Sequence, residues 1–437
     1  MGRLSAYVLL LLGGCGRMGF DDATGAPGDD QPPADTMRTV TVQLGGSANG
    51  TVVGPNGFMC TQGTCTLEVE PGTTVSLRGL AATDGWFDGW TGPCGGNFNC
   101  ALEVNDSVTV SADFAPTPNR VFVTSTTTAG AFGGIAGGDQ ICRDRAVAGG
   151  LTGTFIAYLS DGATDAASRV SSSRGWVRVD GAPYADMPAA FSTGALVFPA
   201  RLDELGNDLG QIRIYTGTDH GNKTIENCLG WTSAVGTDTG TITEGNRVSD
   251  SIGGWGSACS DAAHLLCVET GRSVPVATHA DTGKLAFMTH DEWYPGGGLA
   301  SADAYCASQA ATASLPGTFL AALATTTQSI ASRFDNDAIY RRTDGVRLLR
   351  DAGLFSSDWI DTAPEHDQAG VAISNDFWTG SQKLTDVAPD GGQNCNDWTD
   401  ATMLLSGPQH WTTNTDMRSQ AKTEPCTDGA PILCLEQ

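Results

Sequence analysis

The string "NCLGWTSA" at residues 227–234 is echoed 167 positions later by "NCNDWTDA" at 394–401. A cysteine, a tryptophan and a threonine recur in it with equal spacing. The next cysteine follows at the same distance in both places, since Cys228 and Cys259 are 31 residues apart and so are Cys395 and Cys426. Equal spacing on this scale indicates two copies of one domain, so the echo belongs to a repeated framework.

Further strings extend the duplication over some 150 residues. "GTFIAYLSDGATDAASR" at 153–169 parallels "GTFLAALATTTQSIASR" at 317–333, and "LLCVE" at 265–269 parallels "ILCLE" at 432–436. The outer cysteines of each copy are also comparably spaced, 125 residues apart in the first copy and 128 in the second. We expect the copies at 117–270 and 284–437, with a polar linker at 271–283.

The first residues predict export. "MGRLSAYVLLLLGGCG" has a positive charge at Arg3, a short apolar run and small residues before Cys15. "LGGC" resembles a bacterial lipobox, which implies a signal peptide at 1–14 and acylation of Cys15. That resemblance implies a membrane-anchored lipoprotein of a Gram-negative bacterium, in the outer membrane or at the cell surface; a plain secretory signal is the alternative.

Residues 15–37 are rich in Gly, Pro and Asp and suit an acidic tether.

The charge of the chain restricts its partners. The chain carries 49 acidic against 24 basic residues, a net charge of -25, so nucleic acid is not an expected partner. "YRRTDGVRLLR" (340–350) is either an anion patch or an ordinary solvated face, with arginines paired to Asp344 or Asp351.

Residues 38–116 predict a small β-domain. Their apolar and β-branched residues alternate between turns rich in Gly, Asn and Pro, the pattern of half-buried antiparallel strands. Cysteines at 60 and 65, and at 94 and 100, are close enough to clip a hairpin or loop. The order "GTV", a cysteine pair, "GTTVSL", "FDGWTG" and "VTVSADFAP" resembles an internalin-B-type repeat, which implies a spacer or adhesive module. Trp86 and Trp90 are either core residues or an exposed ligand platform.

Thirteen cysteines leave an even twelve once Cys15 is set aside, as expected for an oxidised exported protein. No two cysteines are as close as in the C-x₂-C pairs of structural zinc sites, and the chain has only 6 histidines, which favours disulfides. Each copy has a strand before its first cysteine and a helix around it, in which Ile141, Ala146 and Val147 recur at helical spacing. The fold class expected is α+β.

The order "GDQIC", "GTFIAYLS", "LVFP", "NCLGWTS" and "LLCVE" resembles endostatin and its bacterial relatives, which are C-type-lectin-like domains. The resemblance implies nested pairing, first cysteine with fourth and second with third. It therefore implies these disulfides: Cys142–Cys267, Cys228–Cys259, Cys306–Cys434 and Cys395–Cys426, beside Cys60–Cys65 and Cys94–Cys100 in the β-domain.

Most known functions of that family do not carry over. The segment 120–141, which matches the zinc-binding segment of endostatin, has no histidine, and the second copy has only His290 there, beside Asp291 and Glu292. The E-P-N, Q-P-D and W-N-D strings of calcium-dependent lectins are absent. We expect no cofactor; calcium held by oxygens of 236–250, or by Asn396 and Asp397, is the alternative.

No nucleophile elbow, H-E-x-x-H, P-loop or dinucleotide fingerprint occurs, so an enzyme is not expected. The hypothesis is an adhesin-like binding protein of the cell envelope that recognises a protein or glycan. Its candidate surfaces are the loops 229–258 and 396–425, which carry Trp255 and Trp411. The alternatives are a structural envelope protein, a calcium-dependent lectin or an enzyme.

We expect a fatty-acid probe fed to cells to label the wild-type protein and to leave the Cys15→Ser variant unlabelled, since acylation needs the thiol. In-gel fluorescence after metabolic labelling measures this. Equal labelling of the two proteins would refute the lipid anchor.

Overall fold

The computed structural model describes residues 37–219, 222–248, 254–349, 353–357, 359–389, 394–402, 407–411, 416 and 422–437, with the backbone alone at 407–411 and 422–424. The predicted signal peptide (1–14), Cys15 and the tether as far as residue 36 lie outside this range. The described chain is a mixed α+β structure, mostly short strands with few helices, as the sequence predicts. We call 38–116 the β-domain, 117–270 copy 1 and 284–437 copy 2.

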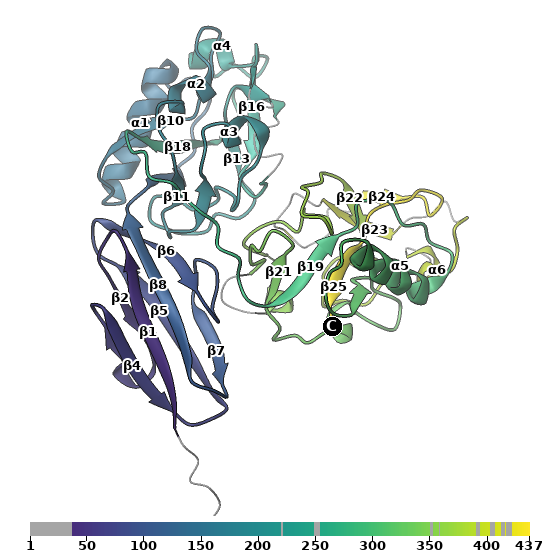
Figure 1. Cartoon of the computed structure of the whole chain (residues 1–437). Coiled ribbons are helices and arrows are strands. Elements are labelled where there is room, and N and C mark those ends of the chain that lie inside the picture. The colour runs from purple at the N-terminus through teal and green to yellow at the C-terminus, as the bar shows by residue number, and fades with distance from the viewer. Residues whose placement is uncertain are drawn as a thin grey trace, which may run out of the picture. The chain divides into compact units, whose positions relative to one another are not determined.

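The β-domain consists of two four-stranded sheets, with orders β4-β1-β8-β6 and β3-β2-β5-β7 (Figure 1). Strands β1 and β8 pair in parallel, and the other pairs are antiparallel. The strands are β1 (Arg38–Gly46), β2 (Gly50–Val53), β3 (Met59–Cys60), β4 (Thr64–Val69), β5 (Thr73–Ala81), β6 (Gly85–Thr91), β7 (Cys100–Val104) and β8 (Val108–Pro116), with a 3₁₀ turn η1 (Pro55–Gly57).

Alternate residues of these strands form the core of the β-domain. Trp90 is buried in this core, and its indole N–H donates to the carbonyl oxygen of Phe98 at 2.5 Å. Trp86 is buried as well, but in a separate small cluster outside this core. Of the two sequence alternatives, the core role therefore holds for Trp90, and Trp86 is not an exposed platform. Disulfides Cys60–Cys65 and Cys94–Cys100 close two short loops.

Copy 1 is built on a sheet with the order β12-β11-β9-β18-β13-β16-β17, and β10 also pairs with β18. Helix α1 packs against β10 and β18 (Figure 1). The elements are β9 (Asn119–Val123), α1 (Gly134–Ala148), β10 (Thr154–Ala157), α2 (Ala166–Val170), β11 (Trp176–Arg178), β12 (Pro183–Ala185), α3 (Ala190–Thr193), β13 (Arg213–Tyr215), β14 (Thr218–Asp219), β15 (Asn222–Lys223), α4 (Cys228–Trp231), β16 (Thr239–Glu244), β17 (Trp255–Ala258) and β18 (His264–Thr270).

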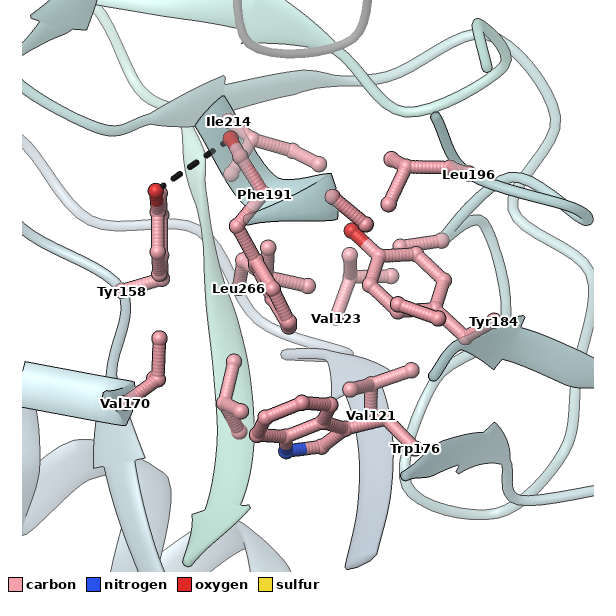
Figure 2. Close-up of a cluster of buried hydrophobic side chains, with 14 of the residues drawn as sticks. Val121, Val123, Tyr158, Val170, Trp176, Tyr184, Phe191, Leu196, Ile214 and Leu266 are labelled. Carbon is pink, nitrogen blue, oxygen red and sulfur yellow. Dashed lines mark hydrogen bonds between the residues drawn. The ribbon is translucent and has the colours of Figure 1, made fainter. Parts of the chain in front are cut away.

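The central strands of copy 1 bury both faces, in two separate cores. On β9, Val121 and Val123 enter one core while Phe122 enters the other, as expected for a period of two. The first core is centred on Phe191, whose ring contacts Tyr158, Trp176 and Tyr184 with centroids 5.0–5.4 Å apart (Figure 2). The second core lies on the α1 side and holds both disulfides.

Copy 2 repeats the plan around the sheet β20-β25-β19-β21, with a separate β22-β23-β24 sheet. Strand β19 again alternates, with Ala286 and Met288 in one core and Phe287 in the other. The elements are β19 (Lys284–Met288), α5 (Gly298–Thr312), β20 (Phe319–Ala321), η2 (Ala331–Arg333), β21 (Tyr340–Arg342), η3 (Leu354–Ser356), β22 (Asp376–Trp378), α6 (Cys395–Trp398), β23 (Gly407–Trp411), β24 (Lys422–Glu424) and β25 (Leu433–Glu436).

One ion pair shows how closely the copies match. The carboxylate of Asp139 on α1 lies 2.7 Å from the guanidinium of Arg169 and accepts from the Ala157 N–H of β10 at 3.0 Å. Asp303 of α5 makes the same contacts, with Arg333 at 2.7 Å and the Ala321 N–H at 2.9 Å. The pair fastens the helix to the neighbouring strand in both copies.

Cysteine pairing in the structure is nested: Cys142–Cys267, Cys228–Cys259, Cys306–Cys434 and Cys395–Cys426. Helix α1 includes the predicted Cys142 region, and of the residues that recur at helical spacing Ala146 is buried and Val147 is exposed. Gly138, Cys142 and Ala146, spaced by four, form the buried face, and Val147 lies about 100° around the helix from Ala146.

Removal of Cys142–Cys267 by paired Cys→Ala substitutions should lower the free energy of unfolding by up to about 5 kcal/mol, because the bond closes a long loop. The same change at Cys60–Cys65 should cost only about 2 kcal/mol. Guanidinium unfolding followed by tryptophan fluorescence and far-UV circular dichroism compares the two variants. A larger loss for the Cys60–Cys65 variant would contradict the proposed role of the long loop.

Candidate functional site

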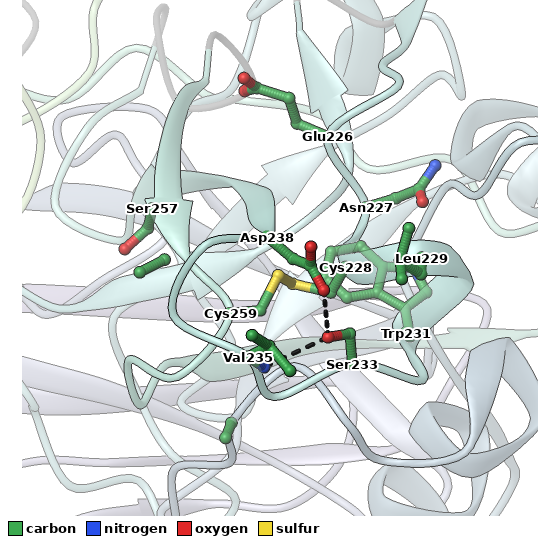
Figure 3. The surroundings of a disulfide bond; sticks show 12 residues. Glu226, Asn227, Cys228, Leu229, Trp231, Ser233, Val235, Asp238, Ser257 and Cys259 are labelled. Atoms are coloured by element: carbon green, nitrogen blue, oxygen red, sulfur yellow. Dashed lines mark hydrogen bonds between the residues drawn. A yellow bond between two sulfur atoms is a disulfide. The ribbon is translucent and has the colours of Figure 1, made fainter.

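The residues of the repeated string form a single left-handed turn. In copy 1, Cys228, Leu229, Gly230 and Trp231 all have positive φ, between 50° and 68°. Asn227 caps the turn, since its side-chain oxygen accepts from the Gly230 N–H at 2.9 Å. Figure 3 shows the Cys228–Cys259 disulfide beside Trp231 at this turn. A left-handed conformation is costly for residues other than glycine, so tertiary contacts must hold it.

Trp231 supplies the main contacts of the turn. Its ring is fully buried, stacks on Phe132 at 5.4 Å and meets Tyr215 edge-on at 5.3 Å. The indole N–H donates to the Ser160 carbonyl at 2.8 Å, just beyond β10. Gly217 passes so close that an added Cβ would lie 2.8 Å from the ring. The turn is therefore tied to the sheet and to the segment that precedes α1.

Copy 2 has the same turn. Cys395, Asn396, Asp397 and Trp398 have φ between 50° and 67°, and the Asn394 side chain accepts from the Asp397 N–H at 3.1 Å. Trp398 is fully buried, and its indole N–H donates to the Ala324 carbonyl at 2.8 Å. The rings that contact Trp398 are also tryptophans, Trp293 and Trp378, with centroids 5.9 and 5.8 Å from that of Trp398. They take the places of Phe132 and Tyr215 in copy 1.

The sequence places a tryptophan beside each inner disulfide, and this is correct, but it does not reveal the handedness of the turn. Asn227 and Gly230 are the only residues of the first turn whose types favour the left-handed region or a cap. Sequence reasoning also missed the loop brace after the turn, in which the Ser233 hydroxyl donates to Asp238 and accepts from the Val235 N–H (Figure 3).

Trp255, a predicted ligand-loop residue, lies at the start of edge strand β17 and is 42% exposed. The Arg247 guanidinium lies over its ring at 5.8 Å, and Glu244 holds Arg247 through a 2.8 Å ion pair. Glu244 also accepts from Gln211 at 2.9 Å. The result is an aromatic surface backed by a fixed cation. Trp411, the counterpart predicted for the other loop, falls in β23, and its side chain lies outside the described residues.

A small cavity lies next to Arg247. Its volume is about 10 Å³, room for one water molecule, and its walls include Tyr158, Tyr184, Thr243 and Glu244. Burial raises the pKa of both tyrosines above the usual value, so their hydroxyls stay protonated. A sugar ring does not fit this space.

The acidic loop residues have partners within the chain. The Asp397 carboxylate accepts from the Thr326 N–H and hydroxyl, both at 2.8 Å, and from Asn394 at 2.5 Å. Partial burial acts to raise the pKa of Asp397, but these hydrogen bonds hold it below the usual value. Across the described ranges, no three His, Cys, Asp or Glu side chains gather in a way that could hold a metal ion.

His290 contacts a carboxylate outside its own segment. Its Nδ1 lies 2.7 Å from Asp367, whose other oxygen accepts from two backbone N–H groups of the following turn. The neighbouring His366 is largely buried, and burial together with the nearby Arg342 lowers its pKa to about 4. Leu202 occupies the equivalent position in copy 1, since the parallel bridges Val123–Asp203 and Met288–Asp367 correspond.

Two arginines of 340–350 form ion pairs within the described part of the chain. Arg342 is buried and lies 2.6 Å from Asp344, and Arg347 lies 2.5 Å from Asp281. This confirms the ion-paired alternative for Arg342; Arg350 and Asp351 lie outside the described residues.

No protein-family model matches the chain, and no curated protein matches it. In the described part of the structure, no helix has the length and apolar character needed to cross a membrane.

Copy 2 should lose stability in acid because of His366. The folded pKa of about 4 lies below the ordinary value of about 6.5, so the unfolded chain binds a proton between these pH values that the folded chain does not. Stability should fall as pH drops from 6.5 to 4, by about 2 kcal/mol after allowance for solvent screening.

The His366→Gln variant should lose most of this acid dependence, and His264→Gln in copy 1 is the matched control. Guanidinium unfolding at pH 4 to 7 measures the effect. An unchanged slope in His366→Gln would show that other groups cause the acid sensitivity.

Proposed function

We propose that this chain is a lipid-anchored binding protein of the bacterial envelope, in which an internalin-type β-repeat precedes two endostatin-like, C-type-lectin-like domains. The ligand is a protein or glycan bound by the loops that follow each Cys-Xaa-Xaa-Trp turn. One observation carries the proposal. The two turns share backbone, cap, disulfide and tryptophan anchor, yet they present different side chains: Leu229 and Gly230 in copy 1, Asn396 and Asp397 in copy 2.

A shared turn that carries different exposed side chains suits a recognition site. A disulfide scaffold fixes where each loop begins, and the exposed residues are free to differ. Trp255 supports a contact role, because tryptophan and arginine are enriched where binding energy concentrates, and here they are stacked together.

An array of glycans and extracellular matrix proteins, probed with the full chain with and without EDTA, tests the proposal. We expect metal-independent binding to protein or glycan spots. Trp255→Ala should weaken it at least tenfold, and substitution of Tyr294, an exposed aromatic residue of copy 2, by Ala should not.

The other outcomes separate the alternatives. Sugar binding that EDTA abolishes would favour a calcium-dependent lectin. Binding that is equal in the wild type and in Trp255→Ala would remove that residue from the surface, and silence across the array would favour a structural role in the envelope.

A further inference from the structure

The second residue of each Cys-Xaa-Xaa-Trp turn stands at the same place in the two copies. Leu229 has φ 53° and ψ 51°, and Asn396 has φ 52° and ψ 61°. Both side chains are exposed, since only the flanking cysteine and tryptophan point into the core. The backbone therefore offers one position twice, with an aliphatic group in copy 1 and an amide in copy 2.

Leucine is an unfavourable choice for this position in two ways. The left-handed region strains a leucine, whereas asparagine and glycine tolerate it. The Leu229 side chain is also 70% exposed, so it gains little from burial in the isolated chain. Asn396 carries neither cost to the same degree, and it donates to the Thr399 hydroxyl at 3.0 Å. Strained residues of this kind concentrate at binding and active sites.

Exposed apolar residues occur on both sides of Leu229 in the sequence. Residues 224–246 contain no Lys or Arg; Glu226 precedes the turn, and the first acidic residue after it is Asp238. Ile225 and Val235, four residues before and six after Leu229, are 97% and 57% exposed. Residues 227–236 of copy 1 contain no acidic residue, whereas the corresponding residues 394–403 of copy 2 include Asp397 and Asp400. The exposed apolar side chain at the turn of copy 1 therefore suits an apolar group, and no Lys or Arg follows it as far as residue 246.

The turn also fixes the backbone at Leu229. The disulfide and the buried tryptophan hold the residues on either side, and the Asn227 side chain caps the turn at Gly230. A backbone that is already fixed loses little conformational freedom on binding, so more of the burial of Leu229 counts toward affinity.

We infer that Leu229 is a specificity-determining contact of copy 1 that inserts into an apolar pocket of a partner protein. The inference rests on the proposed binding function and names its partner class. A lipid surface fits less well, because anionic membranes attract Lys and Arg, which this stretch lacks in a chain of net charge -25.

The full chain is panned against a phage-displayed random peptide library, and the enriched peptides are synthesised and titrated. We expect peptides with aliphatic or aromatic anchors whose Kd rises at least tenfold for Leu229→Asn and Leu229→Gly. Leu205→Asn, which changes a 64% exposed leucine elsewhere in copy 1, should leave the Kd unchanged.

Leu229→Gly separates binding from folding. Glycine accepts a φ of 53° without strain, so its melting temperature should equal or exceed that of the wild type while peptide binding is lost. A fall in melting temperature together with unchanged affinity would assign Leu229 a structural role and overturn the inference.

The remaining outcomes are also decisive. Peptides that bind Leu229→Asn as well as the wild type would leave the binding function standing and remove Leu229 from it. No enrichment of apolar peptides, with positive spots on the array, would overturn the partner class alone; silence in both assays would end the binding function as well. Leu229-dependent sedimentation with phosphatidylglycerol–phosphatidylethanolamine vesicles would replace the protein partner by a membrane.

Discussion

The hydrogen bond from a buried indole N–H to a carbonyl just beyond the strand after the helix is the contact around which each copy is organised. Trp231 makes it to Ser160 and Trp398 to Ala324, both at 2.8 Å. To reach that carbonyl, the chain runs through four residues of left-handed turn, at a cost on the order of 1–2 kcal/mol for each residue that is not glycine. Burial of a tryptophan and closure of a 31-residue disulfide loop can offset that cost.

This arrangement separates the constant from the variable parts of the copies. Three features recur in both copies. They are the ion pair from the helix (Asp139–Arg169 and Asp303–Arg333), the nested disulfides, and the alternation of β9 and β19 side chains between two cores. Differences appear at the exposed residues of the turn and also among buried side chains, since Trp293 and Trp378 replace Phe132 and Tyr215 as ring partners. Leu202 of copy 1 gives way to His366 in copy 2, for example, which brings a group that titrates into an otherwise repeated position.

Much of the framework is readable from the sequence, because cysteine spacing and strand alternation are strict physical constraints. The helix around Cys142 is also readable, but helical spacing alone does not show which of its apolar residues are buried: Ala146 is buried and Val147 is exposed. The left-handed turn is not readable, since cysteine, leucine and tryptophan favour other conformations and tertiary contacts impose this one. The position of Trp255 over Arg247 depends on how β17 pairs with β16, and loop composition carries no signal for that pairing.

Most exposed differences between the copies cost the folded chain almost nothing, so they say little about function. Leu229 is different because both its backbone angle and its exposure are unfavourable in the isolated molecule. Glycine would fit the same turn without strain, as it does one residue later at Gly230, so the fold does not require leucine there. A residue that the fold does not require and that raises its free energy needs a cause outside the fold. An apolar pocket on a partner supplies one, because burial of Leu229 turns the exposed apolar surface into binding energy while the strained backbone stays as it is.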